Sequence, residues 1–355
     1  MTTENPDNAK SVNPSRLPLI DALKAIASQL IVIHHLAFYG PMSDYALPIA
    51  PKLIPWLYDY ARIAVQAFLV MGGFLAAQSL ACDGVLINKP APGLLWRRYL
   101  KLVPPYIGAL LLAMCSAAIA SQLMVHESIP EPPTLARFVA HVFLLQSVLG
   151  FDGLSAGIWY VAIDFQIYAL LLFTLWVARR ISPDSQTLGR MLVATLIVAS
   201  LFWFNRNDNL DDWAIYFFGA YGLGTLVYWT IQRHTVSAWP GIVGVLAIAA
   251  LVIDFRSRIV VALAVAVVLG FGRYTGFIET WPRSRLIGWF GRISYSVFLV
   301  HFPVCLLINA LFERFASHAP EIQLGGMFAA WLASIAAGAV FYRQVECRAQ
   351  RWFKR

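Results

Sequence analysis

The chain has 355 residues, of which 59% are hydrophobic and only 13% are charged, and its mean hydropathy is +0.65. Soluble domains carry about a quarter of charged residues, so the composition excludes an ordinary soluble protein and predicts an all-α polytopic membrane protein. A net charge of +8 is also typical of nucleic-acid binding, but here the basic residues gather in short loops between apolar runs, as the positive-inside rule requires. We therefore expect no nucleic acid as a partner.

Ten apolar runs are long enough to cross a bilayer. In chain order they cover residues 19–39, 56–81, 102–124, 159–177, 190–204, 213–232, 239–254, 258–272, 288–312 and 324–342. An eleventh run, 135–149, is short and carries Arg137 and His141. We expect it to be a re-entrant or interfacial helix, because polar groups are tolerated at membrane depth only where protein or a cavity surrounds them. The sequence thus predicts about ten transmembrane helices and one short helix.

The charges between the runs predict the orientation. If the N-terminus is cytoplasmic, the loops on that side hold most of the arginines and lysines, and the opposite loops are mainly acidic. Counting the run 135–149 as a span would move Arg179 and Arg180 to the outer side. Ten spans with both termini in the cytoplasm therefore fit the charge distribution better.

The domain organisation predicted from these patterns is simple. We expect a disordered cytoplasmic N-terminus (1–18), one membrane domain (19–345) and a basic cytoplasmic tail (346–355). The cysteines are scattered, without metal-ligand spacing; they are Cys82, Cys115, Cys305 and Cys347. We therefore expect no metal site. The sequence gives no oligomeric state.

The first apolar run carries two ionisable residues, Lys24 and His35. Such residues cost about a few kcal/mol to insert and are functional candidates by default. Eleven residues are close to three helical turns, so the two side chains share one face and lie about 16 Å apart along the axis. His34 points about 100° away, and we expect it to be packed or interfacial. Asp21, three residues before Lys24, could pair with it.

The third run begins with the basic segment 96–106. Arg98 and Lys101 lie at positions i and i+3, on one helix face, and suit a phosphate-bearing ligand. The alternative is that they are topology signals that contact membrane lipid headgroups. Pro104 and Pro105 follow, and we expect them to end or kink the helix.

Two further polar groups lie in apolar runs. Asp164 lies near the outer end of its run, where a carboxylate is expensive unless it serves a site. Trp159, at the start of the same run, has an alternative role as an aromatic-belt residue. His301 lies deep in a later run, with Pro303 just beyond it, and the alternative for this histidine is a satisfied core residue.

Taken in order, these segments resemble the acyltransferase-3 family of bacterial integral-membrane acyltransferases. The motif L-D-G-L-R-A-I-A followed by H is matched by residues 20–27 and His35. Later motifs are matched in the same order: F-F-V-L-S-G-F-L by 67–75, R-R-x-x-R-x-x-P-P by 97–105, W-S-L-x-x-E-x-Q-x-Y by 159–168, S-Y-S-x-Y-L-x-H-x-P by 294–303, and a C-terminal glutamate by Glu346. The resemblance covers about residues 17 to 347.

The chain departs from the family pattern at four positions. Lys24 and Lys101 replace arginines, which keeps the charge but loses the bidentate geometry toward carboxylate or phosphate. Asp164 replaces a glutamate and shortens its reach by one methylene, and Gly72 replaces a serine.

The resemblance implies an enzyme of the bacterial inner membrane that transfers an acyl group, usually acetyl, from cytoplasmic acetyl-CoA to a hydroxyl of a cell-surface or lipid-linked glycan. Acyl-CoA would be a substrate, and no cofactor would be bound permanently. On this reading His35 is the general base, or forms an acyl intermediate, and Asp164 orients it. Lys24, Arg98 and Lys101 bind the donor. The supporting or substrate-binding residues are Trp159, Tyr168, Ser294, Tyr295, His301 and Glu346.

Two other classes of protein share some of these features. A secondary transporter would also place histidine and aspartate inside the membrane, as a proton relay. Transporters commonly show two related halves, and we find no repeated motifs here. A non-catalytic scaffold of polysaccharide assembly is the weaker alternative, because the chain keeps both His35 and Asp164.

Overall fold

The computed structural model describes residues 17–352. Nearly all of its regular structure is helical, and the only strands within those residues form a short antiparallel hairpin, β1 (Ile231–Gln232) with β2 (Thr235–Val236). The predicted all-α architecture is therefore confirmed. The predicted disordered N-terminus lies almost wholly outside the described residues, since the first helix begins at Pro18.

The helices follow the apolar runs closely. In chain order they are α1 (Pro18–Phe38), α2 (Met42–Ala46), α3 (Leu53–Tyr60), α4 (Val65–Leu80), α5 (Ala91–Leu123), α6 (Leu135–Val142), α7 (Trp159–Ile181), α8 (Gln186–Phe202), α9 (Ala214–Thr230), α10 (Trp239–Ile253), α11 (Ser257–Thr275), α12 (Phe277–Thr280), α13 (Arg285–Phe315), α14 (Pro320–Phe341) and α15 (Cys347–Trp352). Short 3-10 turns occupy Ala61–Ala64, Phe204–Arg206 and Asp208–Leu210, and a π-helical turn, Tyr342–Glu346, joins α14 to α15.

Eight helical stretches among the described residues are long and apolar enough to cross a membrane. The other two predicted spans form α9, with 17 residues, and α10, with 15, which reach only about 26 and 22 Å. Both are shorter than a hydrocarbon core of about 30 Å. The short run forms only an eight-residue helix, α6, followed by turns, so the prediction that it does not span is confirmed.

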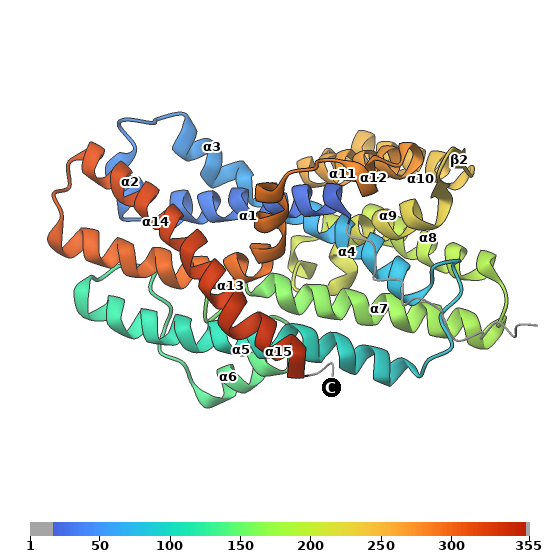
Figure 1. The fold of residues 1–355 in the computed structure, drawn as a ribbon, viewed down its shortest axis with the longest axis horizontal. Coiled ribbons are helices and arrows are strands. Elements are labelled where there is room, and N and C mark those ends of the chain that lie inside the picture. Colours follow the sequence, from blue (N-terminus) through green and yellow to red (C-terminus); the bar gives the residue numbers. More distant parts are fainter. Residues whose placement is uncertain (1–16, 353–355) are drawn as a thin grey trace, which may run out of the picture.

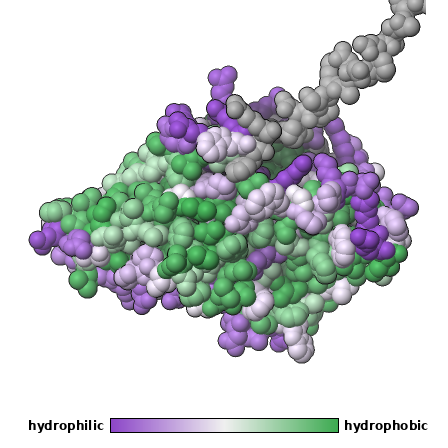
Figure 2. Space-filling model, turned by 90° about the horizontal axis from the view of Figure 1, so that it is seen from below, coloured by the Kyte–Doolittle hydropathy of each residue, from purple (hydrophilic) through white to green (hydrophobic). Residues whose placement is uncertain are grey.

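Helix α13 is central to the packing of the bundle. Helix α13 packs along α1, α5 and α14, and α4 packs along α9. In Figure 1, α14 crosses obliquely in front of α13, while α10 and α11 lie toward the opposite end of the molecule from α2. Figure 2 shows a face largely covered by hydrophobic residues, with hydrophilic ones along its margins, as expected for a surface against lipid.

Helix α5 does not end at Pro104 and Pro105. It continues as one helix of 33 residues, so of the two predicted effects of the prolines, an end or a kink, the end of the helix is excluded. Packing explains why the helix persists: neighbouring helices can satisfy polar backbone groups near a proline. The Tyr295 hydroxyl of α13 donates to the nearby Leu102 carbonyl at 3.0 Å, which holds this turn of α5 against α13.

Glycines allow α4 and α9 to pack backbone against backbone. A Cβ added at Gly73 would collide with the Tyr221 carbonyl of α9, and one added at Gly224 would collide with the Val70 carbonyl of α4. Small residues give this close approach in membranes, where van der Waals packing drives helix association. The contact matters for the site because both helices border it.

We expect Gly73→Ala to separate α4 from α9 and to destabilise the protein by about 1–3 kcal/mol, since the backbone cannot move away without cost. Thermal unfolding in detergent measures the effect. Gly244→Ala in α10 is the matched control, because nothing lies within 4 Å of its added Cβ. Equal melting temperatures for the two variants would contradict the packing described here.

Candidate active site

Two histidines from helices far apart in the sequence meet in the centre of the bundle. The Nδ1 atom of His35 on α1 lies 2.6 Å from Nε2 of His301 on α13, and the two rings are stacked with centroids 4.9 Å apart. His35 is 7% exposed and His301 is fully buried. The two candidates that the sequence placed on separate runs therefore form one pair.

The backbone fixes which nitrogen carries each proton. Nδ1 of His301 faces the Phe298 carbonyl at 2.7 Å and the Val297 carbonyl at 3.2 Å, so it must be protonated to donate. In a neutral His301, Nε2 is then an acceptor, and His35 must donate to it from Nδ1. This leaves Nε2 of His35 with a free lone pair, which is the state that a general base requires.

His34 has a different environment from its neighbour. Its Nδ1 donates to the Leu57 carbonyl of α3 at 2.9 Å, and the ring is buried. This hydrogen bond ties α1 to α3, as expected for a packed histidine.

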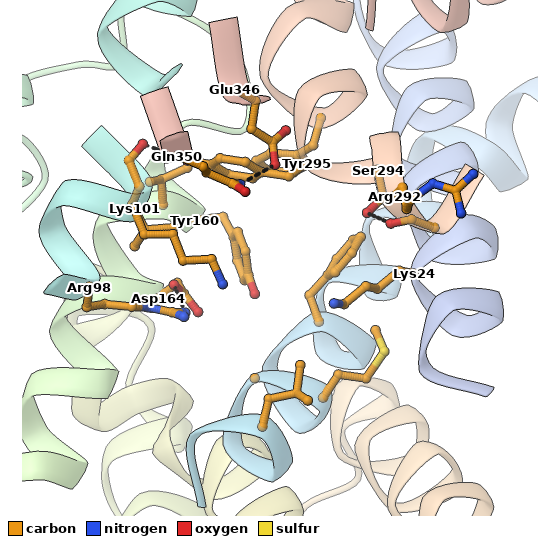
Figure 3. A pocket seen from close by; sticks show the side chains of 18 residues that line it. Lys24, Arg98, Lys101, Tyr160, Asp164, Arg292, Ser294, Tyr295, Glu346 and Gln350 are labelled. Carbon is orange, nitrogen blue, oxygen red and sulfur yellow. Dashed lines mark hydrogen bonds and ion pairs between the residues drawn. The ribbon is translucent and has the colours of Figure 1, made fainter. Parts of the chain in front are cut away.

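A cavity of about 320 Å³ lies on one side of the histidine pair, between the first part of α5 and the first part of α13. Figure 3 shows Lys24 and Lys101 directing their amino groups into it from opposite sides. The cavity is also lined by Arg98, Tyr160, Asp164, Arg292, Ser294, Tyr295, Glu346 and Gln350. The last two come from the C-terminal helical segment, so that segment contributes to the site.

Arg98 and Asp164 form an ion pair in the cavity wall. The guanidinium Nη2 lies 2.5 Å from the Asp164 carboxylate, and the guanidinium also lies over the Tyr168 ring, 5.1 Å from its centroid. The Asp164 side chain is only 9% exposed. The expected contact of Asp164 with His35 is not present: the carboxylate binds the nearest cation, Arg98, and the partner of His35 is His301.

The C-terminal glutamate is held by its neighbours. Glu346 accepts a hydrogen bond from the Ser296 hydroxyl at 2.6 Å and another from Gln350 at 3.1 Å. The π-helical turn ends at Glu346, and such turns frequently occur at functional sites. Four basic side chains (Lys24, Arg98, Lys101 and Arg292) line the cavity against two carboxylates, Asp164 and Glu346. Its lining thus carries an excess of positive charge, which favours an anionic ligand.

Aromatic rings separate this cavity from the histidine pair. Phe68, Tyr160 and Phe298 line the cavity, and their rings contact one another with centroids 5.6 to 6.2 Å apart. Phe298 also contacts the His301 ring, with centroids 6.0 Å apart. A molecule in the cavity is therefore one aromatic layer away from the histidines.

Gly157 lies beside the rings of His35 and Phe298. It has a φ of +77°, a conformation that glycine adopts without strain, and a Cβ added there would lie 3.5 Å from Cε1 of His35. Cε1 lies between Nδ1 and Nε2 in the ring, so this edge of His35 faces the turn. The turn leads into Trp159, which lines a second cavity on the other side of α7.

The remaining predicted site residues can now be placed. Ser294 donates to the Gly291 carbonyl, and Tyr295 donates to the Leu102 carbonyl. Both residues line the first cavity, which contains Lys24 and Lys101 and is called the inner cavity below. Trp159 lines the second cavity, called the outer cavity. The residues of the inner cavity that the sequence prediction missed include Tyr160, Arg292, Phe298 and Gln350. Two of them had a usable signal, since Phe298 precedes His301 by three positions and Tyr160 precedes Asp164 by four, the spacings of neighbours on one helix face.

Comparison with known proteins assigns the family. The model of the acyltransferase family 3 domain, described as an acyltransferase domain, matches residues 17–343. Because this match covers nearly the whole chain, the protein belongs to that family and is a membrane acyltransferase. The resemblance of the sequence motifs is confirmed, and family membership argues against the transporter alternative. No curated protein and no solved structure matches.

We expect Asp164→Ala to destabilise the protein by about 3–5 kcal/mol, because it leaves a largely buried guanidinium without its partner. Thermal unfolding in detergent measures the loss. The double variant Asp164→Leu with Arg98→Met removes both charges, and we expect it to recover part of the stability. If the double variant were less stable than Asp164→Ala, the ion pair would not be the reason for the loss.

Proposed function

We propose that the protein transfers an acyl group, in the simplest case acetyl, from acyl-CoA in the cytoplasm to a hydroxyl of a cell-surface or lipid-linked glycan at the bacterial inner membrane. The observation that carries this proposal is the histidine pair, with its one free nitrogen, close to two cavities that both reach the first turns of α7. Family membership supports the acyl-transfer chemistry, and the geometry supports the roles below.

The inner cavity suits the donor. In the orientation predicted from the loop charges, it opens to the cytoplasm, where acyl-CoA is present. Lys24, Lys101 and Arg292 would bind its phosphates, which lysine holds as a point charge. Arg98 would contribute mainly through its pair with Asp164, which fixes the wall of the cavity. The acyl end of the donor would then approach His35 past Tyr160 and Phe298.

His35 acts as the general base in this proposal. Its Nε2 takes the proton of the acceptor hydroxyl as the hydroxyl oxygen attacks the thioester carbonyl. The carbon–sulfur bond breaks, and the thiolate of CoA leaves and receives the proton from His35. His301 orients the ring and stabilises the imidazolium through the hydrogen bond at Nδ1. Asp164 supports the cavity and does not contact the base.

We expect His35→Ala to lower kcat by about 10²–10⁴-fold, the usual contribution of a general base, while binding of acetyl-CoA is retained. His301→Ala should cost about 10²-fold, because the ring of His35 loses its fixed orientation. The measurement is transfer of labelled acetyl to glycan in membranes, with equal amounts of folded protein.

His34→Ala is the matched control for both variants. It removes the hydrogen bond to Leu57 and should lower thermal stability, but kcat per folded molecule should stay within about twofold, since the His34 ring packs beside His35, with centroids 5.0 Å apart, and makes no hydrogen bond to the pair. Normal transfer by His35→Ala would overturn the mechanism.

We expect Lys24→Gln and Lys101→Gln each to raise KM for acetyl-CoA by about tenfold, because a hydrogen bond to a charged group contributes about 1.5–3 kcal/mol. Lys89→Gln is the control, since Lys89 is exposed and does not line the cavity. Steady-state kinetics with varied acetyl-CoA measure the effect. An unchanged KM in both cavity variants would place the donor elsewhere.

A further inference from the structure

The outer cavity has a volume of about 890 Å³. This volume lies within the range of small-molecule sites, about 300–1,000 Å³. The cavity lies at the start of α7, whereas the basic residues Arg179 and Arg180 lie at the end of that helix. Its walls come from five separate parts of the chain: residues 59–66 before and within α4, the loop 147–153, the start of α7, residues 211–217 at the start of α9, and residues 255–258 at the start of α11. The site is built by the fold, not by one loop.

A buried amide lies at this cavity without a partner. Gln66 on α4 is only 8% exposed and lines the cavity. Within residues 17–352 its side chain makes no hydrogen bond, although a buried amide without a partner costs free energy. A ligand with hydroxyl groups would satisfy both the carbonyl and the amino group of this side chain.

Aromatic rings form one wall. Trp159 contacts Phe217, with ring centroids 5.7 Å apart, and both line the cavity together with Tyr60 and Phe255. The face of an aromatic ring carries partial negative charge, so it attracts the partly positive C–H groups of a sugar ring. Aromatic faces beside a free amide are a combination that recognises carbohydrate.

Two arginines at the outer cavity have hydrogen-bond or ion-pair partners, whereas most of its carboxylates do not. Arg256 binds Asn205, the Leu201 carbonyl and Asp254, and Arg258 binds Tyr216 and Asp208. Four carboxylates that line the cavity make no hydrogen bond or ion pair within residues 17–352; they are Asp59, Asp152, Asp211 and Asp212. Partial burial, and then the neighbouring Asp212 and Asp208, raise the pKa of the Asp211 carboxyl. Arg62 also lines the cavity and makes no hydrogen bond or ion pair in the described part of the chain, so the net charge of the groups without a partner is negative.

The cavity is held close to His35. The buried Arg137 of α6 donates from Nε to the Asp152 carbonyl at 2.8 Å and from Nη2 to the Gly153 carbonyl at 3.0 Å. These bonds fix the loop that forms part of the wall and leads to Gly157, beside the His35 ring. Arg62, another residue of the wall, lies near enough to His35 to interact with it electrostatically.

From these observations we infer that the outer cavity binds the acceptor glycan, and that it selects neutral or amino sugars over acidic ones through the carboxylates at its wall. This inference rests on the proposed function and names the sugar class that the site takes. Gln66 binds a hydroxyl, Trp159 stacks on the ring, and Asp211 with Asp212 repels carboxylates and attracts ammonium groups.

The test measures binding and transfer separately, with the full chain in nanodiscs. The probes are three trisaccharides of equal length: N-acetylchitotriose (neutral), chitosan trisaccharide (cationic) and trigalacturonate (anionic). We expect the first two to bind at least about tenfold more tightly than the third, as like charges at a site repel. The double variant Asp211→Asn with Asp212→Asn should reduce this difference to about threefold or less at the same ionic strength.

Two single variants test the groups that contact the sugar. Gln66→Leu and Trp159→Leu should each weaken binding of N-acetylchitotriose by about fivefold, the loss expected for one hydrogen bond or one stacked ring, and leave KM for acetyl-CoA unchanged. Trp203→Leu is the control for Trp159→Leu, because Trp203 is 75% exposed and does not line the cavity.

The results of these experiments distinguish the inferred sugar selectivity from the proposed acyl transfer. Equal or tighter binding of trigalacturonate, no binding of any trisaccharide, or wild-type binding in both single variants would overturn the inference while leaving acyl transfer to membrane glycan intact. Selective binding without transfer of acetyl to any glycan would support the sugar site and overturn the proposed function.

Discussion

The hydrogen bond from His301 to the Phe298 carbonyl decides the chemistry of the whole site. A backbone carbonyl only accepts, so Nδ1 of His301 must carry a proton. Nε2 of His301 is then an acceptor, so His35 donates to it from Nδ1. This leaves a free lone pair at Nε2 of His35. Helix α13 therefore sets the protonation state of a residue on α1, although the two histidines are 266 positions apart in the sequence.

The two cavities differ in the sign of the charge they present. The inner one has four basic side chains against two carboxylates, and in the outer one the uncommitted groups are mainly carboxylates. Charge of opposite sign in two cavities of one bundle gives each cavity a different preferred ligand. The aromatic layer of Phe68, Tyr160 and Phe298 lies between the inner cavity and the histidines.

Much of the fold could be predicted from the sequence, because hydrophobic runs of sufficient length have few alternatives to helices in a bilayer. The basic cluster was also predictable: Lys24, Arg98 and Lys101 all line one cavity. Periodicity shows which face of a helix a residue occupies, but not which other helix packs there. For that reason the sequence placed Asp164 beside His35, whereas the carboxylate binds Arg98.

Other features depended on packing that no local pattern reveals. Gln66 lies in an apolar run, and its part in a cavity emerges only when α7, α9 and α11 are placed around it. Position 72, where the family has serine, is limited by the Tyr221 ring, which would lie 3.0 Å from an added Cβ. The persistence of α5 through two prolines likewise depends on its neighbours.

The length of α5 has a consequence for access to the inner cavity. At 33 residues the helix is about 50 Å long, which exceeds a hydrocarbon core of about 30 Å by roughly four turns. Arg98 and Lys101 lie about two to three turns from the first residue of α5, so the segment that precedes them projects beyond the hydrocarbon core toward water. In the proposed reaction, a long hydrophilic donor docks on this projecting segment first, and its charged half stays out of the lipid while its reactive end enters the cavity.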